Sequence, residues 1–366
     1  MNYESALNLI IQKQSLGIMP GLSRIEKLLD FMENPQKNLK IIHIAGTNGK
    51  GTVSNAIALA LQAAGYKTGL FTSPWVTDYR EQIQINGDYI SKTDFSFYID
   101  KYRNCDATEF ELLTAVMYKY FFDCGVDYAV VECGMGGLED STNAIPAPEL
   151  AVITSVSFDH TSFLGDALDE IATHKAGVIK QGCKAVLYPN DLTAHIFEEK
   201  CKAVSAKLYK VEQQNDFSLN NLETVNTALT LLGVDRVKAL PLLPARQEYI
   251  TDSLMLDGAH NADGARALSA RLPEKNITAV IGMMRDKDVD AYLSIIAPLC
   301  SKIIATTPSN SRALSADDLK SIAGKYCADA VAVADPLEAI KMLDGEFNLI
   351  CGSFYLARDV RKELTK

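Results

Sequence analysis

Residues 40–52 read Lys-Ile-Ile-His-Ile-Ala-Gly-Thr-Asn-Gly-Lys-Gly-Thr and carry the strongest local signal in the chain. The first six, residues 40–45, form a short apolar run that predicts a buried strand. After the glycine-rich turn, apolar residues recur at helical spacing over residues 52–64, and Gly65 ends that pattern. A strand, a glycine-rich turn and a helix in this order are typical of a phosphate-binding loop in a parallel α/β sheet.

The turn itself, residues 46–52, carries groups suited to phosphate. Backbone N–H groups of such a turn surround phosphate oxygens, and the helix N-terminus adds partial positive charge. Lys50 is placed to reach the β- and γ-phosphates, and the Thr52 hydroxyl to reach Mg²⁺ or a phosphate. The turn departs from a standard Walker A pattern, because Ile44 stands where a glycine is expected and Gly51 where Ser or Thr is expected. A plain structural turn is the alternative, and the lysine between a strand and a helix favours phosphate binding.

Strands and helices continue to alternate along the chain. Buried strands are predicted at residues 67–72, 128–131, 150–155 and 185–188, and an amphipathic helix at residues 166–179.

Pro241 and Pro244 mark a linker, after which the alternation resumes. Strands are predicted at residues 254–256, 278–281, 303–306, 330–333 and 348–350, and helices at residues 262–272, 316–326 and 336–343. Because strands that alternate with helices form parallel sheets, the sequence predicts two α/β domains. The first is a P-loop-type parallel-sheet domain over residues 1–240, and the second is a smaller Rossmann-like domain over residues 247–366.

Composition narrows the functional classes. The 366 residues are 48% apolar and 22% charged, which suits a globular protein of two domains. A net charge of −10 disfavours a nucleic-acid partner. The eight cysteines are scattered without metal-ligand spacing, which indicates reduced thiols in a cytosol. We see no signal peptide and no apolar run of about 20 residues, so we expect a cytoplasmic protein without a membrane partner.

The phosphate loop resembles the A-G-T-N-G-K-G-[ST] segment of folylpolyglutamate and dihydrofolate synthases, which belong to the Mur ligases. Further segments resemble motifs of this family in the same order along nearly the whole chain. They are Thr72-Ser73-Pro74, Thr108-Glu109-Phe110-Glu111, Glu132-Cys133-Gly134-Met135-Gly136-Gly137, Asp140-Ser141-Thr142-Asn143, Asp159-His160-Thr161, His174-Lys175-Ala176-Gly177 and Asp257-Gly258-Ala259-His260-Asn261.

The resemblance implies an ATP-dependent ligase that adds L-glutamate to a folate carboxylate. The acceptor would be a tetrahydrofolate, or dihydropteroate, and the reaction would pass through an acyl phosphate with Mg²⁺ as cofactor and ATP as co-substrate. Residues 1–240 would then be the Mur-ligase central domain with the ATP and folate sites, and residues 247–366 the glutamate-ligase domain. The resemblance also implies a monomer.

The same resemblance implies a role for individual residues. The ATP site would use Asn48, Gly49, Lys50, Gly51, Thr52, Asn226, Arg246 and Asp257. The metal would be held by Ser73, Glu132 and His160. Catalysis would involve Lys50, His160, His260 and Lys175, the last in carbamylated form. The folate would contact Ile18, Met19, Pro20, Thr108, Glu109, Phe110, Glu111, Asp140, Ser141 and Thr142. Taken singly, most of these have ordinary structural readings, such as a turn residue for Ser73 or a solvated lysine for Lys175.

The sequence departs from the family pattern at several points, chiefly in loops near the acceptor. Leu138 stands where an arginine is usual, Trp75 follows Pro74 where a histidine is usual, and His174 replaces a glutamate. The sequence therefore leaves two alternatives open: a Mur-type ligase with a different acceptor, and a non-catalytic homologue that binds ATP or folate.

Overall fold

The computed structural model describes residues 1–17 and 19–365 and divides the chain into two compact units. The first unit contains residues 1–73, 80–157 and 161–241, and the second contains residues 242–366 together with the short segments 74–79 and 158–160. The chain passes from the first unit to the second within the proline-containing linker. The two short segments precede the linker in sequence and yet pack with the second unit.

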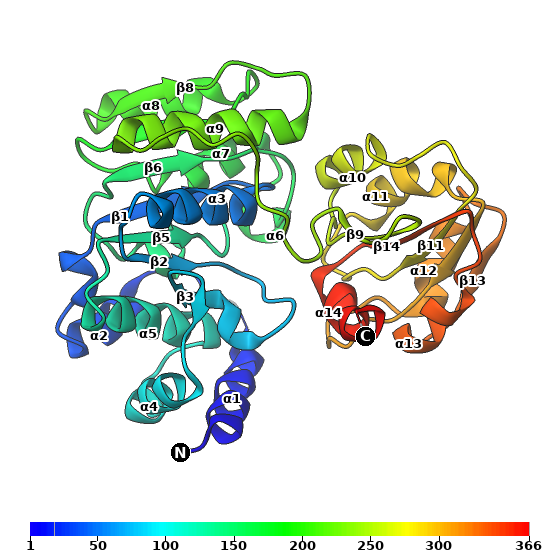
Figure 1. The fold of residues 1–366 in the computed structure, drawn as a ribbon, viewed down its shortest axis with the longest axis horizontal. Helices are drawn as coiled ribbons and strands as arrows, with labels where there is room; N and C mark the ends of the chain where they lie inside the picture. Colours follow the sequence, from blue (N-terminus) through cyan, green and yellow to red (C-terminus); the bar gives the residue numbers. More distant parts are fainter. Residues whose placement is uncertain (18, 366) are drawn as a thin grey trace. The chain divides into compact units, whose positions relative to one another are not determined.

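An eight-stranded sheet forms the centre of the first unit (Figure 1). Its strands are β1 (Ile41–Ala45), β2 (Thr68–Phe71), β3 (Ile83–Ile85), β4 (Asp88–Tyr89), β5 (Tyr128–Glu132), β6 (Leu150–Ile153), β7 (Lys184–Leu187) and β8 (Lys207–Lys210). They lie in the order β4-β3-β2-β5-β1-β6-β7-β8. β3 and β4 pair antiparallel at one edge, and the other six strands are parallel.

The strand β1 lies between β5 and β6, so the chain leaves β1 at the point where the strand order reverses. In the parallel register Ile44 pairs with Glu132 and Ala45 pairs with Ile153. The segments that follow β1, β5 and β6 therefore meet at the same edge of the sheet. Ligands of open α/β sheets bind at this edge.

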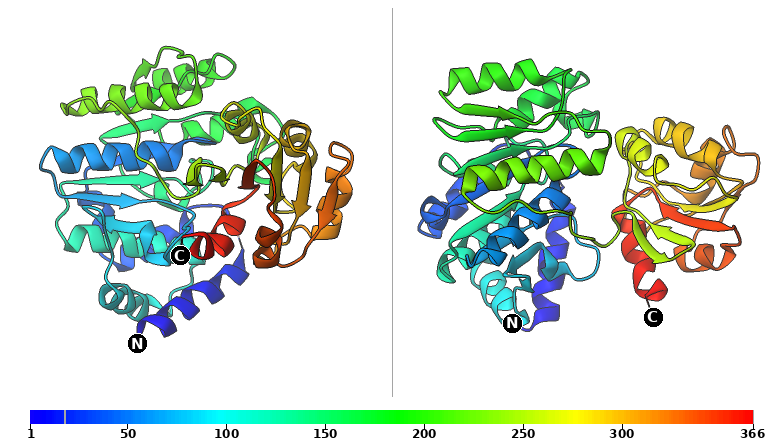
Figure 2. Two further views of the ribbon diagram at one scale, coloured as in Figure 1. Left: turned by 45° about the vertical axis from the view of Figure 1, so that its right-hand side comes forward. Right: turned by 45° about the horizontal axis from the view of Figure 1, so that its top comes forward.

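Helices cover both faces of this sheet. They are α1 (Tyr3–Gln12), α2 (Ser23–Phe31), α3 (Lys50–Ala63), α4 (Lys92–Tyr102), α5 (Glu109–Asp123), α6 (Thr161–Leu164), α7 (Leu168–Ala176), α8 (Ala194–Ala203) and α9 (Phe217–Leu232). α3 and α9 lie side by side on one face, where Val53 and Val225 join a core with alternate strand residues such as Ile42 (Figure 2). α7 and α8 pack on the opposite face together with α5.

The second unit is a six-stranded sheet with helices on both faces. Its strands are β9 (Glu248–Thr251), β10 (Leu254–Leu256), β11 (Ile277–Ile281), β12 (Lys302–Ala305), β13 (Ala330–Ala332) and β14 (Phe347–Cys351), in the order β13-β12-β11-β14-β10-β9. Its helices are α10 (Ala262–Ser269), α11 (Val289–Ile296), α12 (Ala316–Ala323), α13 (Pro336–Ala339) and α14 (Phe354–Leu364). Only β9 runs antiparallel to its neighbour.

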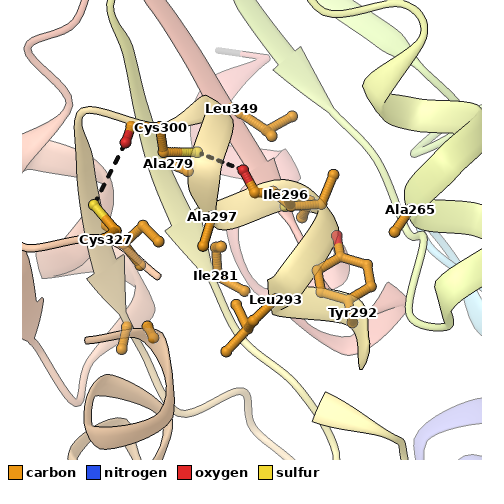
Figure 3. Close-up of a cluster of buried hydrophobic side chains, with 14 of the residues drawn as sticks. Ala265, Ala279, Ile281, Tyr292, Leu293, Ile296, Ala297, Cys300, Cys327 and Leu349 are labelled. Atoms are coloured by element: carbon orange, nitrogen blue, oxygen red, sulfur yellow. Dashed lines mark hydrogen bonds between the residues drawn. The ribbon is translucent and has the colours of Figure 1, made fainter. Parts of the chain in front are cut away.

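One core of the second unit lies between β11 and α11. Figure 3 shows Tyr292, Leu293 and Ile296 of α11 packed toward Ala279 and Ile281 of β11. The structure therefore confirms the predicted alternation of apolar strands and amphipathic helices. It forms two α/β units, each built on a mostly parallel sheet. Within the described residues, no helix combines the length and apolar character that crossing a bilayer requires.

The predicted helix over residues 166–179 is shorter in the structure. α7 begins after Ala167, whose backbone N–H donates to Glu170 Oε2 at 3.1 Å, and its last residue is Ala176. A Cβ on Gly177 would overlap Leu138, so glycine at this position lets the end of α7 pack against the loop after β5.

Candidate active site

The phosphate loop of residues 46–52 is fastened to the segment that follows β6. The Thr47 backbone N–H donates to Ser155 O at 2.6 Å, and the Thr47 hydroxyl donates to Ser157 O at 3.1 Å. Gly46 has a φ of +153°, and a Cβ there would overlap the hydroxyl of Thr154. Glycine is therefore required at position 46, and the loop is held in one conformation before any ligand binds.

Lys50 begins α3 and folds back over the loop. Its ammonium donates to Gly46 O at 3.2 Å and to Thr47 O at 3.1 Å. This leaves the charge of Lys50 at the N-terminus of a 14-residue helix, where anions bind favourably.

Lys175 approaches the same loop from α7. Its side chain is only 2% exposed, and Nζ donates to Gly46 O at 2.8 Å. The reading of Lys175 as a solvated lysine is therefore wrong. Its ammonium lies within reach of the phosphate loop, at the position where the resemblance implies a carbamylated lysine.

Glu132 and Ser73 meet at the ends of the neighbouring strands β5 and β2. Glu132 is 2% exposed, and its Oε2 accepts a hydrogen bond from the Ser73 backbone N–H at 3.3 Å. A carboxylate and a nearby hydroxyl are hard oxygen ligands, which fit Mg²⁺. His160, the third residue expected to hold the metal, belongs to the second unit.

A fully buried chain of hydrogen bonds leads from β1 to Asp140. His43 Nε2 lies 2.8 Å from the Thr142 hydroxyl, which donates to Asp140 Oδ1 at 2.5 Å. The backbone N–H groups of Thr142 and Met135 also donate to Asp140, at 3.0 and 2.7 Å. Because the Thr142 hydroxyl has one proton and gives it to the carboxylate, it must accept from His43, which fixes the imidazole as the Nε2–H tautomer.

The surroundings of this chain of hydrogen bonds keep the His43 imidazole neutral. Burial, with the nearby charge of Lys180, lowers the pKa of His43 to about 3. Cys133 Sγ lies 3.1 Å from His43 Nε2, and burial raises the pKa of that thiol well above its usual range. Tyr118 donates to Thr142 O at 2.6 Å. Thr142 is therefore held at its hydroxyl, amide and carbonyl, and its side chain has no exposed surface.

Two other residues expected to contact folate serve the start of α5. Thr108 and Glu111 form a capping box, in which the Thr108 backbone N–H donates to Glu111 Oε2 at 2.8 Å. Arg24 also donates to this carboxylate, at 3.2 Å, and donates to Met19 O. Both Thr108 and Glu111 are buried, so their hydrogen-bonding groups organise the helix rather than present themselves to solvent.

The remaining residues expected at the folate site are more accessible. Glu109, Phe110 and Ser141 are half-buried, whereas Met19 and Pro20 are exposed. Ile18 lies outside the described residues.

The amide of Asn226, expected at the ATP site, is used within the protein. Its Nδ2 donates to Val237 O at 3.1 Å, and its Oδ1 accepts from the Val237 backbone N–H at 2.8 Å. With both ends of the amide engaged and 4% of the residue exposed, Asn226 anchors the chain that follows α9. Its contact with ATP, which the resemblance implies, stays a prediction.

The second unit carries its own polar cluster around Asp159. Lys287 Nζ donates to Asp159 Oδ1 at 2.5 Å, and Asn261 Nδ2 donates to Oδ2 at 3.0 Å. His260 Nε2 lies 3.4 Å from Oδ2, and His160 Nε2 lies 3.5 Å from Lys287 Nζ. His160 takes a φ of +52°, a conformation that few non-glycine residues adopt. Burial raises the pKa of Asp159, but the hydrogen bond and charge of His260 and the charges of His160 and Lys287 hold it well below its usual range.

Asp257 and Arg246 lie in the same unit. Asp257 accepts backbone N–H groups of Gln247 and Ala259, both at 2.7 Å, which ties the loop after β10 to the linker end. The Arg246 guanidinium stacks over the Phe354 ring at 3.8 Å from its centroid. Arg246 is therefore held in a defined orientation at the start of the second unit.

Sequence reasoning did not single out Asp159, Lys287 or His43 as members of these clusters. Asp159 stood inside a matched motif, but its pairing with Lys287 joins residues 128 positions apart. His43 occupies an interior position of β1, where a histidine reads as an ordinary core residue. Among the described residues, no group of three or more His, Cys, Asp or Glu side chains forms a metal site by itself.

Family models and a sequence relative both identify the same family for this chain. The family model described as the Mur ligase middle domain matches residues 44–263, and the one described as the Mur ligase glutamate ligase domain matches residues 245–354. The dihydrofolate synthase/folylpolyglutamate synthase of Bacillus subtilis is 30% identical over 99% of both chains.

Solved structures extend the likeness to three dimensions. The bifunctional folylpolyglutamate synthase/dihydrofolate synthase of Yersinia pestis, complexed with AMPPNP and Mn, superposes with a TM-score of 0.86 at 26% identity, covering 100% of this chain and 98% of that one. A structure of an enzyme of the same name with Mn, AMPPNP and L-glutamate bound matches equally well, with a TM-score of 0.86, 26% identity and the same coverage.

Proposed function

Because the chain belongs to the Mur ligase family, and within it to the folylpolyglutamate and dihydrofolate synthases, we propose that it is an ATP-dependent ligase that adds L-glutamate to a folate carboxylate. One observation of the structure carries the proposal. Lys50 and Lys175, on different helices, both direct their ammonium groups to Gly46 O in a preformed phosphate loop. Two cations at one loop suit the polyphosphate of ATP, whereas a structural turn gives no reason to bury Lys175.

The reaction transfers the γ-phosphoryl group of ATP to the acceptor carboxylate. The acyl phosphate is then attacked by the amine of glutamate, which forms an amide and releases phosphate. Such reactions depend mainly on positioning and on stabilising negative charge. The loop N–H groups and Lys50 hold the phosphates, and Lys175 contributes a further charge beside Gly46.

Glu132 and Ser73 fit the oxygen ligands that Mg²⁺ requires, and we propose that they hold it with His160. When bound, Mg²⁺ neutralises charge that develops on the transferred phosphoryl group. Carbamylation of Lys175, which would replace a cation with an anion beside Gly46, is a separate proposal. Intact-mass and peptide mass spectrometry after gentle, carbonate-buffered purification would check it, and an unmodified Lys175 in active enzyme would contradict it.

We propose that the folate binds near Asp140, with Ser141, Glu109, Phe110 and Met19 as further contacts. Asp140 is held by three N–H or O–H groups within the described residues, so its orientation is fixed before the acceptor binds. His260, Arg246 and Asp257 of the second unit are assigned to the same reaction. The chain is further proposed to act as a cytoplasmic monomer without nucleic acid, in line with its net charge of −10.

The test incubates purified protein with ATP, Mg²⁺ and glutamate, and offers dihydropteroate or a tetrahydrofolate as acceptor. ADP release and product masses are measured together. We expect one glutamyl residue added to at least one acceptor. Lys50→Met should lose turnover, whereas Lys40→Met, which removes an exposed lysine before β1, should not. Turnover of ATP with neither acceptor, or none at all, would contradict the proposal. Light scattering tests the monomer.

A further inference from the structure

The ring of Phe354, the first residue of α14, lies against two residues that the proposed function assigns to the reaction. The Arg246 guanidinium carbon lies over the ring, 3.8 Å from its centroid. The imidazole of His260 meets the ring edge to face, with 5.9 Å between the ring centroids and 71° between the planes. Phe354 is 8% exposed and belongs to a buried core of the second unit, so packing holds the ring in place. A single aromatic side chain therefore contacts both functional groups.

Gly258 leaves the room for this arrangement. A Cβ at this position would overlap the ring of Phe354, so any other residue would displace it. The backbone N–H of Gly258 donates to Ala245 O at 2.9 Å, and its carbonyl accepts from His260 Nδ1 at 2.9 Å. The backbone next to Arg246 and the imidazole of His260 are therefore both anchored at the residue against which Phe354 packs.

Stacking on an aromatic ring restricts a guanidinium group in a way that suits phosphate. A cation above an aromatic face is attracted to it, and the attraction grows when water is excluded. With its flat face against a ring, a guanidinium directs its N–H donors outward in its own plane, which is the geometry that binds two phosphate oxygens at once. An arginine that already holds one orientation also loses less side-chain freedom when its ligand binds.

We propose that Phe354 is a positioning residue of the ligase, whose ring orients the Arg246 guanidinium for the phosphates of ATP. The inference rests on the proposed function, in which Arg246 belongs to the ATP site. Phe354 acts through Arg246 rather than by touching the nucleotide. The plainer role of a buried aromatic residue is to fill the core, and that role predicts a loss of stability without a specific loss of ATP binding.

The experiment measures the Kd of ATP by calorimetry, with Mg²⁺ present and acceptor and glutamate omitted. Phe354→Leu should weaken ATP binding by about 3- to 30-fold, the range for a cation–π pair from exposed to desolvated, and Phe354→Tyr, which keeps the ring, should restore binding. In the Arg246→Met background, Phe354→Leu should change the Kd by about twofold or less, because the guanidinium that it orients is already gone. Phe347→Leu is the matched control. It shortens a ring of β14 that is 2% exposed in another core of the same unit, so it should lower the thermal midpoint and leave the Kd unchanged.

An equal loss on Phe354→Leu with and without Arg246 would overturn the proposal, as would an unchanged Kd in Phe354→Leu or in Arg246→Met. A loss of ATP binding in Phe347→Leu as large as that in Phe354→Leu would reduce Phe354 to a core residue. Should Phe354→Leu fold poorly, Phe354→Met gives the same comparison with a more flexible replacement. ATP binding is measured without turnover, so a protein that shows the coupled losses and adds glutamate to no folate would refute the proposed function alone.

Discussion

Replacing Thr142 by valine removes one hydroxyl from the buried chain between His43 and Asp140, and its effect can be estimated from the structure. The hydroxyl donates to the Asp140 carboxylate at 2.5 Å and lies 2.8 Å from His43 Nε2. Losing a hydrogen bond to a carboxylate costs about 1.5–3 kcal/mol, and a stranded buried donor costs about 1–3 kcal/mol. Cys133 Sγ, 3.1 Å from the same nitrogen, remains as a weak acceptor. We therefore expect a loss of about 3 kcal/mol in the free energy of unfolding of the first unit.

Urea unfolding followed by far-ultraviolet circular dichroism measures this loss. The single tryptophan, Trp75, packs with the second unit and does not report on the first. Faster hydrogen exchange at the amides of Met135 and Thr142 should accompany the loss, because both donate to Asp140. In a double-mutant cycle, His43→Leu should cost less in the Thr142→Val background, since the stranded donor is gone. A loss below about 1 kcal/mol, or additive effects of the two substitutions, would refute the reasoning.

Three further outcomes follow from the same structure. The folded pKa of His43, about 3, lies below its ordinary value of 6.5, so its contribution to stability is present above pH 6.5 and is lost as the pH falls toward 3. His43→Gln should flatten the pH dependence of the unfolding free energy near pH 5 by about 1.4 kcal/mol per unit, and an unchanged slope in urea titrations would contradict this. Gly46→Ala should abolish ATP binding in calorimetry, because the new Cβ overlaps Thr154, and retained affinity would show that the loop can move. Asp159→Asn should destabilise the second unit by about 3 kcal/mol at pH 7 by leaving Lys287 unpaired, as measured by tryptophan fluorescence during unfolding. The low folded pKa of Asp159 makes its contribution present above about pH 4 and lost below it, so a difference that persists in stronger acid would count against the ion pair.

The sequence predicted the parts of the fold in which local pattern and tertiary packing agree. Short apolar runs such as residues 150–155 are buried on both faces of a parallel sheet, and burial of this kind leaves a readable signature. The two-residue edge strand β4 and the exposed strand β8 bury too few side chains to leave such a signature in the sequence. α9 was not predicted as a helix, although it supplies Asn226.

Sequence predicts the local structure of the candidate site where a motif fixes its own geometry, but it does not reveal which distant residues come together there. The phosphate loop is a local structure, and its glycines and lysine can be read directly. Asn226 shows the limit, because only the folded chain reveals that its amide pairs with Val237, while its contact with the nucleotide stays a prediction. Whether Thr142 faces a ligand or the interior likewise depends on His43, which lies 99 residues away.

The segments 74–79 and 158–160 also have a consequence for how the protein is made. A ribosome completes them long before residue 242, yet Val76 is buried among residues of the last strands and helix of the chain. During synthesis, the side chains of Val76 and Asp159 stay exposed to solvent. They remain so until more than 80 further residues have emerged after position 160 and the second unit begins to form. A nascent chain stopped at residue 241 would therefore expose apolar and charged side chains that the finished protein hides, and would be a natural target for chaperones and proteases.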